Sequence, residues 1–226
     1  MDLLSHRVCI ESQRTKEDMQ LASSLFRSWK TLGLPDYLQL DNELGFHGSH
    51  KYPHSFGIVI RLCLHFGIQP VFIPIGEPWR NGAIEHFNDT YNCKFFRMQW
   101  FSSYSYMKKQ SKNFQRFHNK NHRYSCLKGK TPDQFTSEFS DKLSKLASNR
   151  KFPKIKGIPD GNVILIRFIR SDRKLDVFGE KFLVSKDLVY SYVKVIIVTS
   201  IHTLQIYLGD ELVDSFIYQL PDEFFD

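Results

Sequence analysis

Two carboxylates and the polar residues next to them are the main candidates for chemistry in this sequence. Asp41 follows Tyr37–Leu40, a short run that we predict to be a buried strand, and Asn42 comes directly after it. Glu85 lies in the first turn of a helix expected from about residue 83 to residue 100, after a loop rich in Gly and Pro (PIGEPWRNG). Catalytic groups collect at the carboxyl ends of strands in open α/β sheets. Because one loop, one helix and one strand separate the two acids, we expect the chain to fold back and bring them together.

Two carboxylates that lie a few ångströms apart repel each other unless a cation lies between them. Mg²⁺ is held by one or two carboxylates together with water and substrate phosphates. Such sites activate water or a sugar hydroxyl for in-line phosphoryl displacement, often with two ions roughly 3.5 to 4 Å apart. The alternative is structural: an aspartate after a strand can cap a turn, and a glutamate in a first helical turn interacts favourably with the helix dipole. The residue types alone leave both interpretations open.

The elements that must position these acids alternate between strand and helix over the first hundred residues. We expect a strand at 5–13, a helix that starts near Asp18 and ends at Gly33, a second helix at 55–65 and a short strand at 71–73. This alternation is typical of an α/β fold with parallel strands.

The positive charge of the chain is concentrated in its middle. The net charge is +7, but residues 101–156 hold 14 Lys and Arg against 3 Asp and Glu. Residues 1–100 are balanced at 10 against 10, and residues 157–226 carry 7 against 11. A basic stretch of this kind is expected to contact a polyanion. The alternative is a solvated helix surface.

The predicted organisation has three parts. Residues 1–148 form the α/β region with a basic helical extension, in which Thr131 and Pro132 start a final short helix. Residues 149–160, with two prolines and several charges, form a linker. Residues 161–226 consist of short β-prone runs divided by turn residues, which predicts a small all-β module, a barrel or a sandwich.

Several classes of protein are disfavoured by composition. No apolar run reaches the roughly 20 residues that cross a bilayer, so we expect no membrane partner. The four cysteines form no CxxC pair and fit a reducing cytosol. Five histidines match no metal-ligand spacing and do not indicate a zinc site: His47, His50, His54, His65 and His86.

Two ordered motifs resemble the catalytic core of the retroviral-integrase and insertion-sequence transposase family. The string GLPDYLQLDNELGFHG has a Gly-hydrophobic-Pro lead before a strand that ends in Asp41-Asn42. The string PIGEPWRNGAIEHFNDTYNCKFF then supplies Pro78, Asn81, Gly82 and Glu85, with Asn88 one turn later. FHNKNHRYSCLKGKTPDQF resembles the segment that often closes such cores, so the resemblance spans residues 1–138.

This resemblance implies a ribonuclease H-like fold and a DNA-processing activity. Asp41, Glu85 and an upstream Asp would hold two Mg²⁺ or Mn²⁺ ions. Asn42 and Asn88 would support these ligands or contact the DNA or protein backbone, and the alternative is that they are ordinary polar residues of a turn and a helix surface. The DNA backbone would run along Arg80, Lys94, Arg97 and the basic residues of the middle stretch, chiefly Lys108, Lys109, Lys112, Arg116, Lys120, Arg123, Lys128 and Lys130. The trailing β module is similar to the small barrel often appended to these cores. Related recombinases act as multimers, which implies self-association.

The sequence also departs from the family pattern. Glu43 stands where the family usually has Gly after Asp-Asn, and the gap from Asp41 to Glu85 exceeds that of retroviral members. The opening MDLLSHRV is similar to the second strand of such cores, so the first strand and its catalytic Asp are not found. Asp2 is a weak candidate for the role of that missing metal ligand, and the alternative is a frayed terminal residue. We therefore expect an N-terminally truncated core.

Three hypotheses follow. The leading one is a DDE-type transposase or integrase fragment that performs metal-dependent phosphodiester cleavage and strand transfer. The second is a catalytically inactive, DNA-binding remnant of a transposase. The third is an unrelated α/β nuclease that cuts DNA without joining it. The composition fits a prokaryotic cytoplasmic protein associated with the nucleoid.

Overall fold

The structure, a computed structural model, describes residues 1–15, 17–47, 54–138 and 144–221. The chain divides into two compact units, and each is described by itself. The first unit contains Met1–Arg14, Ser24–Leu34 and Asn81–Lys151. The second contains Thr15–Ser23, Pro35–Arg80 and Phe152–Asp226. Within the described residues, no helix is both long and apolar enough to cross a membrane.

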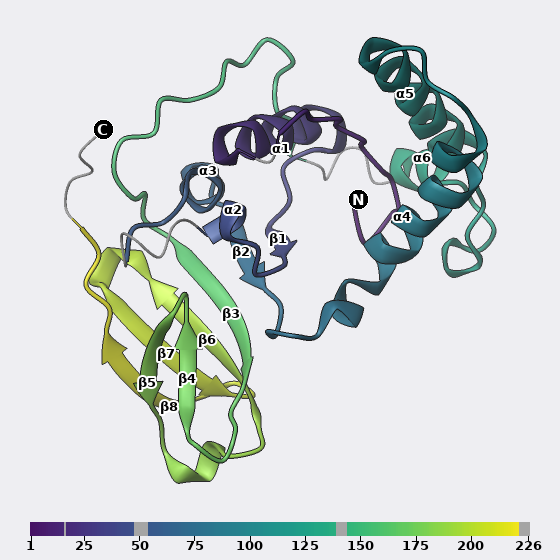
Figure 1. Cartoon of the computed structure of the whole chain (residues 1–226). Helices are drawn as coiled ribbons and strands as arrows, with labels where there is room; N and C mark the ends of the chain where they lie inside the picture. Colours follow the sequence, from purple (N-terminus) through teal and green to yellow (C-terminus); the bar gives the residue numbers. More distant parts are fainter. Residues whose placement is uncertain (16, 48–53, 139–143, 222–226) are drawn as a thin grey trace. The chain divides into compact units, whose positions relative to one another are not determined.

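From α1 to β2 the order of helices and strands is the expected one, with the addition of the short helix α2 (Figure 1). The α-helices are α1 (Asp18–Leu32), α2 (Leu44–His47), α3 (Ile58–His65), α4 (Gly82–Lys94), α5 (Tyr104–Asn121) and α6 (Pro132–Ser137). The strands are β1 (Tyr37–Leu40), β2 (Gln69–Phe72), β3 (Asn162–Phe168), β4 (Lys174–Val177), β5 (Glu180–Leu183), β6 (Tyr192–Val198), β7 (Thr203–Leu208) and β8 (Glu211–Ile217). The predicted helix at 83–100 is too long: α4 ends at Lys94, and a 3₁₀ turn (Phe96–Met98) follows it.

The second unit is built on a six-stranded sheet in the order β1-β2-β3-β6-β7-β8. β1, β2 and β3 run parallel, and the remaining neighbours pair antiparallel. The parallel pair β1–β2 agrees with the α/β fold expected for the first hundred residues. α3 buries an apolar face that includes Val59, Leu62 and Cys63, because its sequence is hydrophobic nearly all round. Gly67, at a φ of +70°, ends this helix and lets the chain turn into β2.

The C-terminal strands continue this sheet. β3 pairs with β2 through Val71↔Ile164 and Phe72↔Leu165, and Phe178 at the β4–β5 turn packs against Phe72 with ring centroids 5.1 Å apart. Gly161 lies so close to α3 that a Cβ there would meet a Leu64 methyl at 2.8 Å. The barrel-like form of the C-terminal module and the missing first strand are therefore not confirmed. The boundaries at 148, 149–160 and 161 stay a prediction, and the compact units follow a different division.

The predicted strand at 5–13 is wrong, because this segment of the first unit pairs with helix side chains and not with another strand. The amide of Asn119 on α5 accepts a hydrogen bond from the Val8 N–H and donates one to the Val8 carbonyl, both at 2.9 Å. Gln115, one turn earlier on α5, accepts a hydrogen bond from the Ile10 N–H at 2.8 Å. These amides satisfy buried backbone groups that a neighbouring strand would otherwise pair.

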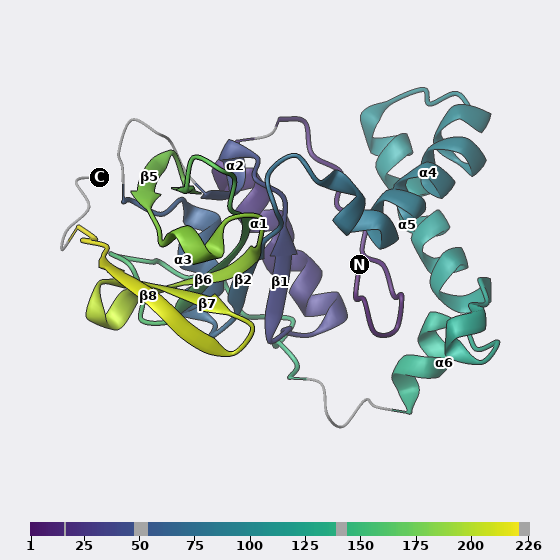
Figure 2. The same ribbon diagram turned by 90° about the horizontal axis from the view of Figure 1, so that it is seen from below.

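Helices α4, α5 and α6 belong to the first unit (Figure 2). An aromatic cluster joins α4 to α5, with the Phe114 ring centre 5.1 Å from that of Phe95 in a tilted contact and 5.5 Å from that of Tyr91 in an edge contact. α6 begins as predicted, because Thr131 is its N-cap and forms a capping box with Gln134, and Pro132 lies in its first turn. The sequence predicts helical structure throughout residues 104–148, but residues 122–131 and 144–148 form no α-helix, and residues 139–143 lie outside the described residues.

Candidate functional site

Asp41 lies where the sequence predicted it, at the carboxyl end of β1 in the second unit. Its side chain is exposed, and one carboxylate oxygen accepts a hydrogen bond from the Glu43 N–H at 3.0 Å. The carboxylate thus caps a turn, which was the structural alternative, while still facing solvent. The two roles are compatible, because a carboxylate has about four lone-pair sites.

Asn42 connects the ends of three neighbouring strands. Its amide nitrogen donates a hydrogen bond to the Ile73 carbonyl just beyond β2, at 2.8 Å. Its amide oxygen accepts a hydrogen bond from a guanidinium nitrogen of Arg167 on β3, at 2.9 Å. These bonds fix the backbone next to Asp41, so Asn42 positions the loop that carries the acid.

Arg167 is a buried cation beside this loop that sequence reasoning missed. Only 4% of the residue is exposed, and its guanidinium also donates to the carbonyls of Ile73 (3.1 Å), Ile166 (2.9 Å) and Asp176 (2.9 Å). Burial lowers the pKa of Arg167 to about 10, and Asp176 partly opposes that effect. An arginine inside a β-prone run is usually at a surface, so the sequence held no local signal for this role.

The loop after β2 is also ordered by side chains of the second unit. Arg80 forms an ion pair with Glu77, and its guanidinium lies 4.6 Å from the centre of the Tyr192 ring. The Tyr192 hydroxyl donates a hydrogen bond to Glu77 at 2.7 Å. The hydrogen bond that Arg80 donates to the Glu77 carboxylate raises the pKa of Arg80, and Tyr192 adds to that effect. Arg80, which we expected to contact DNA, therefore already has an anionic partner.

Glu85 lies in the first turn of α4, as predicted, and belongs to the first unit. Its side chain is exposed, and so is that of Asn88 one turn later. Since Asp41 and Glu85 belong to different units, the expectation that they come together stays a prediction. In the part of the chain that the structure describes, no three His, Cys, Asp or Glu side chains are grouped to hold a metal ion. The donor types nevertheless fit Mg²⁺, because both are exposed carboxylates.

Basic side chains follow one stripe of α5. Lys109, Arg116 and Lys120 are exposed and recur at helical intervals, on the side opposite to buried Ser111, Gln115, His118 and Asn119. Lys112 forms an ion pair with Glu11 of the same unit at 2.6 Å, so part of its charge is already balanced within the protein. Lys94, Arg97 and Lys108 are exposed, and Arg123 donates a hydrogen bond to the Gly129 carbonyl at 2.8 Å.

A comparison with protein families found a match to the middle of the chain. Residues 66–132 match the family model described as "Integrase core domain". This segment is similar to an integrase core. A search of curated proteins gave no match to the chain.

The integrase core segment (residues 66–132) contains most of the predicted site residues. It includes Glu85, Asn88 and every residue that we expected to contact DNA, from Arg80 to Lys130. Asp41, Asn42 and Arg167 lie outside it. The resemblance seen in the motif around Glu85 is therefore confirmed by an independent comparison.

Sequence reasoning also missed a cluster of aromatic rings that the integrase core segment forms. The imidazoles of His118 and His122 are stacked 5.0 Å apart, and the Tyr124 hydroxyl lies 3.1 Å from Nε2 of His118. Burial lowers the pKa of His118 to about 4, and the neighbouring His122 adds to that effect. His118 is thus neutral near pH 7 and acts in packing.

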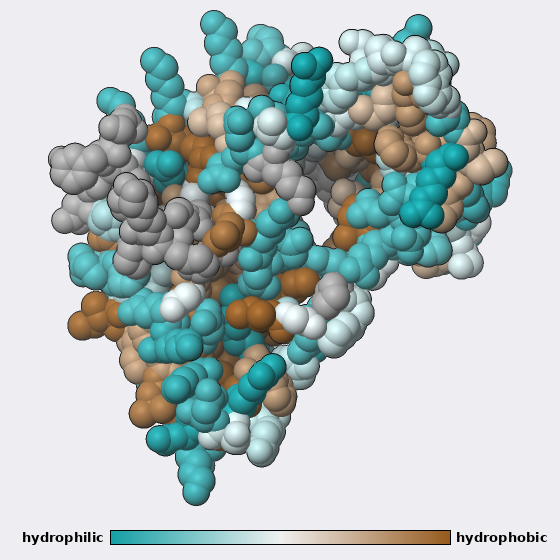
Figure 3. Space-filling view, in the orientation of Figure 1, coloured by the Kyte–Doolittle hydropathy of each residue, from teal (hydrophilic) through white to brown (hydrophobic). Residues whose placement is uncertain are grey.

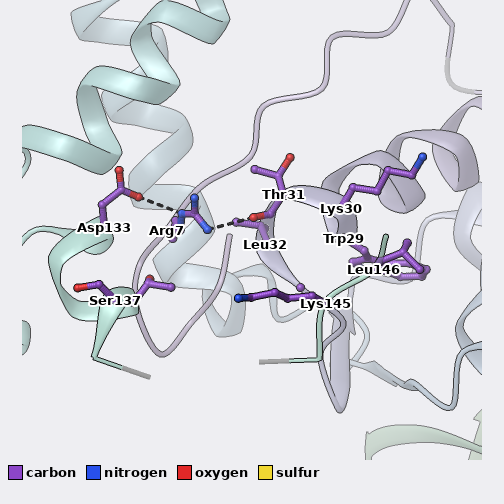
Figure 4. Close-up of a pocket in the computed structure, with 11 residues that line it drawn as sticks. Arg7, Trp29, Lys30, Thr31, Leu32, Asp133, Ser137, Lys145 and Leu146 are labelled. Carbon is purple, nitrogen blue, oxygen red and sulfur yellow. Dashed lines mark hydrogen bonds and ion pairs between the residues drawn. The ribbon is translucent and has the colours of Figure 1, made fainter. Parts of the chain in front are cut away.

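A pocket of about 450 Å³ lies in the first unit, between the end of α1 and α6 (Figure 4). Arg7 bridges its wall, with an ion pair to Asp133 at 3.0 Å and a hydrogen bond to the Thr31 carbonyl at 3.0 Å. None of the predicted site residues lines this pocket. It therefore adds nothing to the candidate site.

Proposed function

We propose that this chain is a DDE-type transposase or integrase that cleaves DNA and joins a 3′ end to a target strand. The integrase core segment carries this proposal, because it includes the Pro78 to Glu85 motif and the basic helix α5. Further support comes from Asp41, which lies at a strand end where such chemistry is usually located.

The residues have distinct roles in this proposal. Asp41 and Glu85 would hold Mg²⁺ or Mn²⁺, and the bound ion would supply activation of water or of a 3′-hydroxyl and stabilisation of the leaving oxygen. Asn42 keeps the Asp41 loop in place through its bonds to Ile73 and Arg167. The exposed basic side chains of α5 bind phosphates and position the DNA without reading its sequence. Two copies of the chain acting together on paired ends are part of the proposal.

A second candidate is a DNA-binding protein that has lost catalysis. It is favoured by one feature: the sequence motifs supply two acids, whereas the family site that they resemble uses three. Such a protein would keep the basic stripe of α5 and bind DNA without changing it.

Replacing Glu85 tests the catalytic proposal. We expect Glu85→Gln to abolish Mg²⁺-dependent joining of a labelled oligonucleotide to a plasmid, because a neutral amide holds a hard cation poorly. DNA affinity should be unchanged. Asp89→Asn is the matched control, since Asp89 is an exposed acid on the same helix and loses the same charge. Equal activity in both variants would rule out Glu85 as a ligand.

Asp41→Asn extends the same experiment to the other unit. We expect the same loss of joining, with Asp36→Asn, an exposed acid ahead of β1, as its control. A wild-type chain that binds DNA yet neither cuts nor joins it, with Mg²⁺ or with Mn²⁺, would support the second candidate. A chain that cuts DNA but never joins ends would be a nuclease.

A further inference from the structure

Three large apolar side chains are exposed on the segment between α4 and α5, and Met98 and Trp100 are more exposed than Phe96, which is 44% exposed. Met98 is 75% exposed and Trp100 is 82% exposed, whereas Trp29 in the same unit is 3% exposed. Gln99 between them has an extended backbone (φ −146°, ψ 155°) and ends the 3₁₀ turn Phe96–Met98. Figure 3 shows apolar side chains interleaved with hydrophilic ones over the surface of α4 and α5.

The base of this segment is firmly packed. Phe95 is 8% exposed, and Phe101 lies 5.8 Å from it and 5.3 Å from Phe96, ring centre to ring centre. Within the described residues, the Trp100 indole makes no ring contact or hydrogen bond. Trp100 is therefore a projecting ring on a segment whose neighbouring rings are packed.

The charge around Trp100 identifies the kind of partner. Residues 90–132 contain ten Lys and Arg and no Asp or Glu, and Lys94 and Arg97 next to the segment are exposed. A second copy of the chain would bring this charge against itself, which opposes association through this surface. A polyanion that carries flat apolar groups matches both the positive charge and the exposed indole. DNA with unstacked bases is such a polyanion, because it has a negatively charged backbone and flat base faces.

We propose that Trp100, with Met98 beside it, stacks on unpaired bases at a DNA end. This deepens the proposed function, on which it rests for the choice of DNA as ligand. Exposed aromatic rings stack on any base when the base is free of its partner, and a positively charged surface holds the backbone beside it. The chain would accordingly prefer DNA whose terminal bases are frayed over a fully paired duplex.

Two labelled DNAs test the proposal: a short duplex that is fully paired, and the same duplex with a few unpaired terminal bases. We expect the wild-type chain to bind the frayed duplex more tightly, and Trp100→Ala to weaken that binding by about tenfold. Binding of the paired duplex should change less than about twofold, and the salt dependence should not change, since no phosphate contact is lost. Trp100→Phe should keep most of the preference. Tyr190→Ala, which removes a 71% exposed ring in the other unit, is the control.

The outcomes separate this inference from the proposed function. No binding of either DNA by the wild-type chain would contradict the proposed function itself. Binding of both DNAs with equal affinity, or an equal loss on both in Trp100→Ala, would overturn the stacking role alone. It would also be overturned if Trp100→Ala converted a dimer to a monomer in sedimentation. Tryptophan-dependent binding to anionic phospholipid vesicles without any preference for frayed DNA would overturn it as well.

Discussion

At the scale of single residues, the candidate acids depend on side chains that hold their surroundings. Asp41 is exposed, but the loop next to it is tied by Asn42 to Ile73 and to Arg167. A buried guanidinium is stable only when its donors are satisfied, and Arg167 satisfies four of its five N–H groups with uncharged oxygens. The geometry of the Asp41 loop is therefore maintained by a residue far away in the sequence.

His118 makes the stability of the first unit depend on pH. Burial holds its folded-state pKa near 4, whereas a histidine in an unfolded chain has a pKa of about 6.5. The unfolded state therefore binds more protons between these values, and stability is lost as the pH falls through this window. We expect the free energy of unfolding in urea to fall by about 2 kcal/mol between about pH 7.5 and about pH 5 on account of this group.

His118→Gln isolates the contribution of His118. Between about pH 7.5 and about pH 5, the free energy of unfolding of this variant should fall by about 2 kcal/mol less than that of the wild type, because glutamine does not titrate. His86→Gln, at an exposed position on α4, should keep the wild-type pH dependence. An identical pH dependence in His118→Gln and the wild type would show that His118 is not buried in the neutral form.

At the scale of elements, the two opposite sides of α5 have different roles. One side uses amides to hold the segment around Val8 and Ile10, and the other presents Lys109, Arg116 and Lys120 to solvent. The aromatic residues interleaved with these charges, such as Phe114 and Tyr124, are mostly half-buried in the packing between helices, although Phe117 is 63% exposed. The helix thus has a polar buried side and a basic exposed side.

The basic stripe predicts how DNA affinity responds to salt. Each phosphate contact on duplex DNA contributes about −0.9 to the slope of log K against log salt. Changing Lys109, Arg116 and Lys120 to Ala together should therefore make the slope less steep by about 2.7. The control is a double change of the exposed Lys181 and Lys186 in the other unit, which should leave the slope nearly unchanged. A slope that stays the same in the triple variant would exclude α5 as the phosphate-binding element.

At the scale of the whole molecule, the sheet of the second unit draws on distant parts of the chain. β1 and β2 come from the first third, and β3, β6, β7 and β8 come from the last third. The match to the integrase core covers residues 66–132, so the sheet joins part of that segment to strands beyond it. The C-terminal strands are therefore structurally coupled to the loop that carries Asp41.

Separating the C-terminal strands tests this coupling. A fragment of residues 161–226 should keep the sheet formed by β3, β6, β7 and β8, but the edge of β3 that pairs with β2 would be unpaired. Exposed strand edges associate with one another, so we expect the fragment to form oligomers in sedimentation at concentrations where the full chain is monodisperse or forms a defined assembly. A monomeric, fully folded fragment would support the predicted boundary at residue 161 as a true domain boundary.

The sequence by itself determined the features that depend on neighbours along the chain. It correctly located β1, the position of Asp41 after it, Glu85 in the first turn of α4, and the Thr131 cap, because hydrophobic spacing and caps are local signals. The tertiary structure alone decided that residues 5–13 pair with α5, that β3 joins β2, and that Arg167 is buried. These outcomes rest on contacts such as Arg167 to Asn42 and Val8 to Asn119, between residues 125 and 111 positions apart. The physical reason is that a buried polar group must find a partner, and which partner reaches it depends on packing in three dimensions.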